Sequence, residues 1–198
     1  MSYHIATAVF ERQYVVKKSR FIARVVPVES REQALAAVRR AKADFPDARH
    51  HCWAYILGPP GDAYNAGMSD DGEPSGTAGK PILNVLQHGK LGDVLVVVIR
   101  YFGGIKLGAG GLVRAYGTAT GLALDSAPSR VRRDMQTYRL SGEFSQEQLI
   151  RHWLSTVEGE MKDVEYGEQV VFQLVLPVEN EPILLAFCAL HRLELDAP

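Results

Sequence analysis

The segment Val94–Ile99 constrains the fold of this chain more than any other part of the sequence. Its six residues are all apolar, and five of them are β-branched. A strand with one face toward water would alternate apolar and polar residues, and this segment does not. We therefore predict a fully buried central strand, in a chain whose 198 residues are enough to form a core without disulfide bonds.

Two glycine-rich polar segments, residues 69–81 and 100–116, lie on either side of this strand. Each is expected to run into the start of a helix. Glycine permits a positive φ and lets a ligand approach the main chain closely. The free N–H groups at a helix start suit a phosphate or a carboxylate. We expect an anion site made of backbone amides; the alternative is that the glycines only permit tight turns.

Neither segment matches a nucleotide-binding fingerprint. Val113 stands where the dinucleotide motif requires a small residue, and Pro81 stands where the Walker A motif requires Ser or Thr. The expected site is therefore looser than these motifs, with Lys80, Lys106 and Arg114 close to the amides.

Residues 1–128 form the first predicted domain, an α/β unit. A capping box, Ser30–Gln33, opens its first helix. The polar stretch 58–79 has no hydrophobic period, and we predict a long loop there. The other elements expected in this domain are strands within 13–28 and at 51–57, and helices at 30–44, 81–88 and 111–125.

Residues 132–198 form the second predicted domain. A strand at 132–143 is followed by a helix to residue 157, opened by a second capping box, Ser145–Gln148. The remaining elements are expected to be strands at 164–166 and 169–176, a helix at 182–191 and a short strand at 193–195. This β-α-β-β-α-β order is the ferredoxin-like pattern, so the fold class is α+β with two domains.

Composition and charge indicate the compartment and the kind of partner. Cys52 and Cys188 are too far apart in sequence to suggest a disulfide framework, no segment approaches 18 apolar residues, and the chain starts without a signal-peptide core, so we expect a cytoplasmic protein without a membrane partner. Residues 1–127 carry a net charge of +4 and residues 128–198 a net charge of −5. The basic part is the one expected to face an anionic partner.

Three carboxylates and two histidines are the candidate catalytic residues. Carboxylates so close together can act as acid and base or hold Mg²⁺, although turn carboxylates commonly bind only nearby backbone N–H groups. No nucleophile elbow is present, and we expect neither a metal nor a cofactor. The candidates are His50, His51, Asp70, Asp71 and Glu73.

A second set of residues has the chemistry of nucleic-acid binding. Basic side chains bind phosphates, and exposed aromatic side chains stack on unpaired bases. Arg100, Tyr101 and Phe102 lie at the end of the central strand, where ligand sites often form. The residues expected to bind phosphate or nucleic acid are Arg49, Gly79, Lys80, Arg100, Tyr101, Gly103, Gly104, Lys106, Gly110, Gly111 and Arg114.

At these residues the chain resembles the IMPACT family, whose bacterial members include the YigZ-like proteins. The matching motifs cover most of residues 17–116 and are specific in combination. They are Lys18–Phe21, Ala48–Cys52, Ser69–Pro74, Gly76–Pro81, Val98–Gly104 and Leu107–Tyr116.

The resemblance implies a first domain like domain 2 of ribosomal protein S5 and a second, ferredoxin-like domain like domain V of elongation factor G. That pair occurs in sequence in the elongation factor, where it contacts the ribosome. Eukaryotic relatives carry an extra N-terminal module that binds a regulator of translation initiation. This chain begins almost at the shared core, so we do not expect that partner here.

Three functions remain open at this point. The first is a binding protein for RNA or the ribosome, linked to the regulation of translation. The second is an enzyme acting on a phosphorylated or anionic small molecule, which requires the carboxylates and a histidine to converge in a cleft. The third is a protein-interaction scaffold, which predicts an exposed apolar patch.

Overall fold

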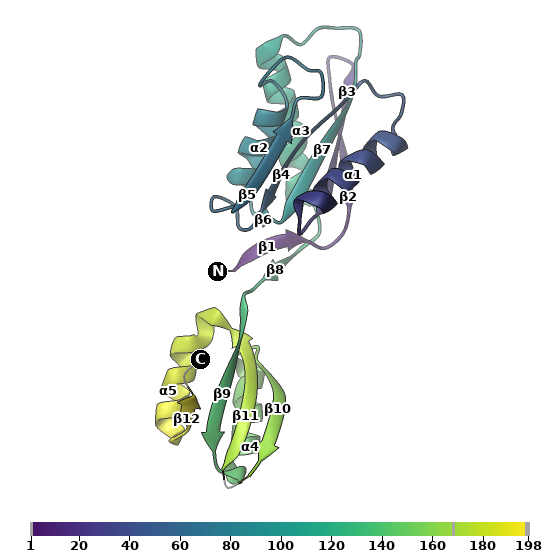
Figure 1. Cartoon of the computed structure of the whole chain (residues 1–198). Coiled ribbons are helices and arrows are strands. Elements are labelled where there is room, and N and C mark those ends of the chain that lie inside the picture. Colours follow the sequence, from purple (N-terminus) through teal and green to yellow (C-terminus); the bar gives the residue numbers. More distant parts are fainter. Residues whose placement is uncertain (1, 168, 197–198) are drawn as a thin grey trace. The chain divides into compact units, whose positions relative to one another are not determined.

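The computed structural model describes residues 2–167 and 169–196. The chain divides into two compact units, residues 2–132 and residues 133–198 (Figure 1). Each unit has its own sheet and its own buried core. Within the described part of the chain, no helix is both long enough and apolar enough to cross a membrane.

A five-stranded antiparallel sheet forms the centre of the first unit. The predicted buried strand lies in the middle as β7, and residues 94–99 have no solvent exposure, which confirms the prediction. The strands follow one another across the sheet in the order β2 (Phe10–Val16), β3 (Ser19–Pro27), β7 (Val94–Tyr101), β4 (His50–Leu57) and β5 (Asn65–Ser69).

Helices cover both faces of this sheet. Val94, Val96 and Val98 pack in a core with α2 (Gly79–Gln87) and α3 (Ala109–Ser126). The alternate residues Leu95, Val97 and Ile99 pack in a separate core with α1 (Arg31–Asp44). Because successive side chains of a strand point to opposite faces, six apolar residues in a row require two apolar layers.

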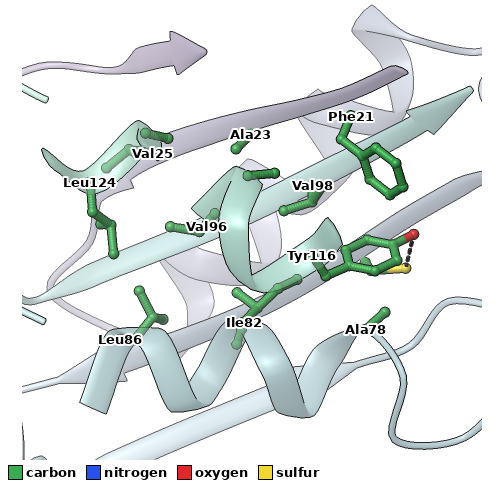
Figure 2. Packing of buried hydrophobic residues seen from close by; sticks show 14 of the residues in the cluster. Phe21, Ala23, Val25, Ala78, Ile82, Leu86, Val96, Val98, Tyr116 and Leu124 are labelled. Atoms are coloured by element: carbon green, nitrogen blue, oxygen red, sulfur yellow. Dashed lines mark hydrogen bonds between the residues drawn. The ribbon is translucent and has the colours of Figure 1, made fainter. Parts of the chain in front are cut away.

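The core under α2 and α3 is shown in Figure 2. Ile82 and Leu86 of α2 are fully buried against the sheet. Phe21 of β3 packs edge-on against Tyr116 of α3, with ring centroids 5.2 Å apart and an interplanar angle of 86°. Tyr116 is the largest fully buried side chain of the core and also carries a polar group into it.

The segment predicted as a long loop contains a strand. Residues 65–69 form β5, which pairs along one side with β4 at the edge of the sheet. Its side chains are exposed or half-buried, so no apolar alternation marked it in the sequence. Gly67 is required there, because a Cβ would lie 2.6 Å from the ring of Tyr55.

A three-stranded sheet closes the first unit, in the order β6 (Leu91–Gly92), β1 (Tyr3–Ala6) and β8 (Ser129–Arg132). The strand predicted at 132–143 is β9 (Met135–Gly142) of the second unit. The strand before it, β8, was not predicted; it pairs with β1 and belongs to the first unit. The buried carboxylate of Asp93 holds this region together. It accepts hydrogen bonds from the Tyr3 hydroxyl, the Gly58 amide and the Arg132 guanidinium.

The second unit is ferredoxin-like, as predicted from the order of its elements. Its four antiparallel strands stand in the order β10-β11-β9-β12, with the first and third strands of the unit adjacent at the centre. The elements are β9 (Met135–Gly142), α4 (Glu147–Thr156), β10 (Glu160–Tyr166), β11 (Val170–Pro177), α5 (Glu181–His191) and β12 (Glu194–Asp196). Short 3-10 turns, Phe144–Gln146 and Val178–Asn180, precede α4 and α5.

The two predicted capping boxes have different outcomes. Ser30 caps α1 by accepting a hydrogen bond from the Gln33 amide. The second box lies two residues earlier than predicted: Glu143 and Gln146 bind each other's backbone amides. The turn Phe144–Gln146 comes before α4, so the first free amides of the helical segment lie closer to Glu143 than to Ser145.

Replacing Ile82 by Ala tests the packing of α2. Ile82 is fully buried, so the free energy of unfolding of the first unit should fall by about 2–5 kcal/mol. Val15→Ala is the control, because Val15 is 55% exposed on the edge strand β2. This change should lower the free energy of unfolding by at most about 0.5 kcal/mol. Urea unfolding followed by circular dichroism measures both, and equal stability of the two variants would contradict the assigned core.

Candidate functional site

A cleft of about 390 Å³ lies where the central strand ends and α3 begins. It brings together segments that are far apart in sequence: the start of β4, the loop before α2, the end of β7 and the first turn of α3. Its lining residues are Arg49, His50, Glu73, Pro74, Arg100, Phe102, Lys106, Leu107, Gly108, Ala109 and Leu112.

The start of α3 faces this cleft without a side-chain cap. Its N-cap residue is Gly108, which has φ of 73° and no side chain to accept a hydrogen bond. No acidic residue stands in the first turn. The amides of Ala109, Gly110 and Gly111 have no intrahelical partner because of their position, so they carry the positive end of the helix dipole toward the cleft.

A buried ion pair forms the inner wall of the cleft. Arg100 Nη1 lies 2.5 Å from Glu73 Oε1, and both side chains are less than a tenth exposed. The Tyr116 hydroxyl donates to the same carboxylate oxygen at 2.8 Å. A buried charge is tolerated only with such partners, so Glu73 neutralises Arg100 and holds the loop before α2 against β7. Arg100 Nε, also buried, has no hydrogen-bond partner in the described part of the chain.

Cys52 lies behind this pair and is not a reactive thiol. Its Sγ donates to the Asp70 carbonyl at 2.9 Å and lies 3.3 Å from the Tyr116 hydroxyl oxygen. Burial raises the pKa of the Cys52 thiol to about 12, so the thiol stays protonated at neutral pH.

Unpaired cations surround the mouth of the cleft. Arg49 and Lys106 line it, and neither forms an ion pair with any residue that the structure describes. Arg114 reaches back along α3, so that its Nη1 would lie 3.7 Å from a Cβ placed on Gly110. His50 binds the Asp71 carbonyl through Nδ1 at 2.9 Å, so Nδ1 carries a proton and Nε2 remains for a ligand.

The backbone amides of the first glycine-rich segment bind an anion that the protein itself supplies, the carboxylate of Asp70. Asp70 Oδ1 accepts from the amides of Ala78 and Gly79, at 3.0 and 2.8 Å, and Oδ2 accepts from Gly76 at 2.8 Å. Burial acts to raise the pKa of Asp70, but the three amides outweigh it and hold the pKa below its ordinary value. Gly79, expected to bind phosphate, therefore donates to Asp70 at the start of α2.

Asp71 and His51 also serve the fold. Asp71 has φ of 42°, and its carboxylate binds Lys42 Nζ and the His51 amide, each at 2.7 Å. His51 is buried on the α1 side, with Nε2 donating to the Phe45 carbonyl at 3.1 Å. Burial, followed by the nearby Lys42 and His50, lowers the pKa of His51 against the opposing effect of Asp71. Neither candidate catalytic residue lines the cleft.

Several predicted phosphate-binding residues lie outside the cleft. Tyr101 faces α1, where its hydroxyl donates to Asp47 and the Arg20 guanidinium lies 4.4 Å from its ring centre. Lys80 is exposed on α2 and does not line the cleft. Gly103 is needed for packing, since a Cβ there would lie 2.0 Å from the Lys18 carbonyl carbon.

The remaining glycines divide between the two expected roles. Gly104 has φ of 84° in an open turn, as the tight-turn alternative predicts. Gly110 and Gly111 occupy the exposed first turn of α3. Five lining residues were not singled out from the sequence: Pro74, Leu107, Gly108, Ala109 and Leu112. Gly108 was detectable, because a glycine directly before a helix can cap it without a side chain.

Two further features bear on the other functions. Among residues 2–167 and 169–196, no three His, Cys, Asp or Glu side chains are placed to hold a metal ion. The second unit has an apolar groove between α4 and α5, lined by residues that include Leu149, Trp153, Ile183, Phe187 and Leu190. Leu190 is 76% exposed, so this groove has the apolar character that an interaction scaffold requires.

Comparison with known proteins places the chain in a family. The Impact N-terminal domain matches residues 17–124, and a domain of unknown function, DUF1949, matches residues 140–183. An IMPACT family member from Haemophilus influenzae is 40% identical over 178 residues, covering 90% of this chain and 84% of the relative. The IMPACT family member YigZ from Escherichia coli is 41% identical over 162 residues, covering 82% and 79%.

A solved structure, described as that of a hypothetical protein, is 37% identical and has a TM-score of 0.67. It covers 100% of this chain, which covers 97% of that protein in turn. The chain therefore belongs to the IMPACT family, as its motifs predicted, and it has the family's two-domain mixed α/β architecture.

Replacing Asp70 by Ala tests the internal cap of α2. Three amides lose their acceptor, so the free energy of unfolding should fall by about 2 kcal/mol at pH 7. Because the folded-state pKa of Asp70 is lowered, its contribution is present above the ordinary aspartate value of 3.8 and is lost as the pH falls through the lower folded value. The difference between wild type and variant should therefore shrink below about pH 4.

Asp62→Ala is the matched control, because Asp62 lies exposed in the turn after Gly58. Thermal unfolding between pH 3 and pH 7 follows all three proteins. If the Asp70→Ala variant is as stable as the Asp62→Ala variant at pH 7, the Asp70 carboxylate does not stabilise the start of α2.

Proposed function

We propose that this protein binds RNA through the cleft of its first unit, in a cytoplasmic role linked to translation. The observation that carries the proposal is the combination of free amides, unpaired cations and one exposed aromatic ring around a single cleft. Amides and cations suit phosphate, and the ring suits an unpaired base.

The charge of the cleft supports an anionic ligand. Glu73 is the acidic side chain among the lining residues, and it is bound to Arg100 and Tyr116. This pair is neutral, so the net charge of the lining comes from Arg49 and Lys106. Arg114 adds a further cation beside the start of α3.

Phe102 supports a single-stranded ligand. Its side chain is 58% exposed although it follows the central strand directly, and the Arg100 guanidinium lies 5.7 Å from its ring centre. An exposed ring beside phosphate-binding groups is the arrangement that proteins use to stack unpaired bases. A duplex keeps its bases stacked inside, so it has no base to place on this ring.

The link to translation rests on the family and the pair of domains. Membership of the IMPACT family is established, and the two units follow one another as the similar domains do in elongation factor G. The acidic second unit repels a phosphate backbone, so we assign nucleic-acid contact to the first unit and an orienting or protein-binding role to the second.

Most of the candidate catalytic residues of the enzyme alternative have structural roles. It requires carboxylates and a histidine to converge in the cleft, but Asp70 and Asp71 bind backbone amides and Lys42 outside it. Glu73 and His50 do line the cleft. Glu73 already accepts two hydrogen bonds on one oxygen, which favours a structural role for this carboxylate.

A double variant, Arg49→Ala with Lys106→Ala, tests the proposal. Removing two phosphate contacts should weaken binding of single-stranded RNA about tenfold at low salt and reduce the slope of log affinity against log salt by about 1.4. Fluorescence anisotropy across a salt series measures both quantities.

Lys90→Ala is the control, because Lys90 is exposed before β6, at the opposite end of β7 from the cleft. It should leave affinity and slope nearly unchanged. If the double variant behaves like Lys90→Ala, RNA does not bind at this cleft.

A further inference from the structure

The cleft has more hydrogen-bond donors than an internal phosphodiester can use. The start of α3 offers the amides of Ala109, Gly110 and Gly111, and Lys106 and Arg49 add charged donors. An internal phosphodiester carries one charge and two free oxygens. A terminal phosphomonoester carries close to two charges and three strong acceptor oxygens.

Arg100 is a second and independent indication of an anion in this cleft. Its side chain is more than nine-tenths buried in the cleft wall, and its Nε has no hydrogen-bond partner in the part of the chain that the structure describes. Arg100 Nη1 is bound to Glu73, so the Nε–H is the one group of this guanidinium shown to lack an acceptor. Buried polar groups in proteins almost always have a partner, and Arg100 lines the same cleft as the uncapped start of α3, so this N–H indicates a further acceptor there.

Part of the lining of the cleft is apolar. Phe102 and Leu107 lie on the segment between β7 and α3, Leu112 follows in α3, and Pro74 comes from the loop before α2. At about 390 Å³ the cleft is near the small end of the range for ligand pockets, roughly 300–1,000 Å³. It therefore has room for one small ligand with an anionic end and a flat, weakly polar body.

We infer that the cleft recognises the 5′-phosphomonoester of a nucleotide, with the phosphate at the start of α3 and the base against Phe102. This inference rests on the proposed function and makes it specific, because a 5′-phosphorylated RNA end differs from the interior of an RNA strand. A free nucleoside 5′-monophosphate carries the same chemistry and is the second source that the test distinguishes.

The test compares three single-stranded RNAs of one sequence, about eight nucleotides long. The first has a 5′-phosphate, the second has a 5′-hydroxyl, and the third has a 5′-hydroxyl with a 3′-phosphate, so that its charge equals that of the first. Titration calorimetry with the full chain should show the 5′-phosphorylated RNA binding about tenfold more tightly than either of the others.

Two variants assign this preference to the cleft. Ala109→Pro removes one amide donor from the first turn of α3, and proline is well tolerated at this first helical position. Phe102→Ala removes the exposed ring. Ala109→Pro should abolish most of the advantage of the 5′-phosphate, and Phe102→Ala should weaken binding of that RNA about fivefold or more. Lys90→Ala serves again as the control, and circular dichroism confirms that each variant is folded.

Competition with a nucleoside 5′-monophosphate shows whether the ligand is a 5′-phosphorylated RNA end or a free nucleotide. Displacement at concentrations similar to those of the 5′-phosphorylated RNA supports the inference with the free nucleotide as ligand. Displacement only at far higher concentrations supports it with the RNA end as ligand.

The remaining outcomes overturn one proposal or both. Equal affinity for all three RNAs overturns the inference and leaves RNA binding in place. Binding of the monophosphate without binding of any RNA overturns the proposed function and supports the inference. Binding of neither overturns both.

Discussion

The burial of β7 on both faces is the constraint from which the rest of the first unit follows. Apolar side chains at every position require a helical layer on each side, and α1 covers one face while α2 and α3 cover the other. Arg100 continues the face of Val96 and Val98, so its charge is carried beneath α3. A buried guanidinium needs a counter-charge, and Glu73 from the loop before α2 supplies it. The position of that loop is therefore coupled to the strand.

The two glycine-rich segments have the same local structure but different roles. Each delivers free amides at the start of a helix. At α2 the carboxylate of Asp70 occupies the amides from within the chain, and the segment becomes a rigid part of the scaffold. At α3 the N-cap is Gly108, no carboxylate reaches the amides within the described residues, and the helix start opens into the cleft. The amides of the second segment therefore have no side-chain acceptor among the described residues and remain available for the ligand that we propose.

The sequence predictions were correct where the signal lies within one element, and they failed where an element depends on residues far away in the chain. The central strand, the helices of the first unit and the ferredoxin-like order depend on apolar periodicity within one element, and the structure confirms them. β5 was missed because an exposed edge strand needs no apolar pattern. β8 was missed because it is stabilised by pairing with β1, about 125 residues away along the chain.

The sequence by itself determined where most of the elements lie, which strand is central and which family the chain belongs to, because local periodicity and contiguous motifs carry that information. Only the tertiary structure decided which polar residues are available to a ligand. Asp70, Asp71 and His51 have the same chemistry as Glu73 and His50 when read in order, yet of these five residues it is Glu73 and His50 that line the cleft. That outcome depends on partners from distant segments, such as Arg100 and Tyr116, which stand 27 and 43 positions from the Glu73 that both contact.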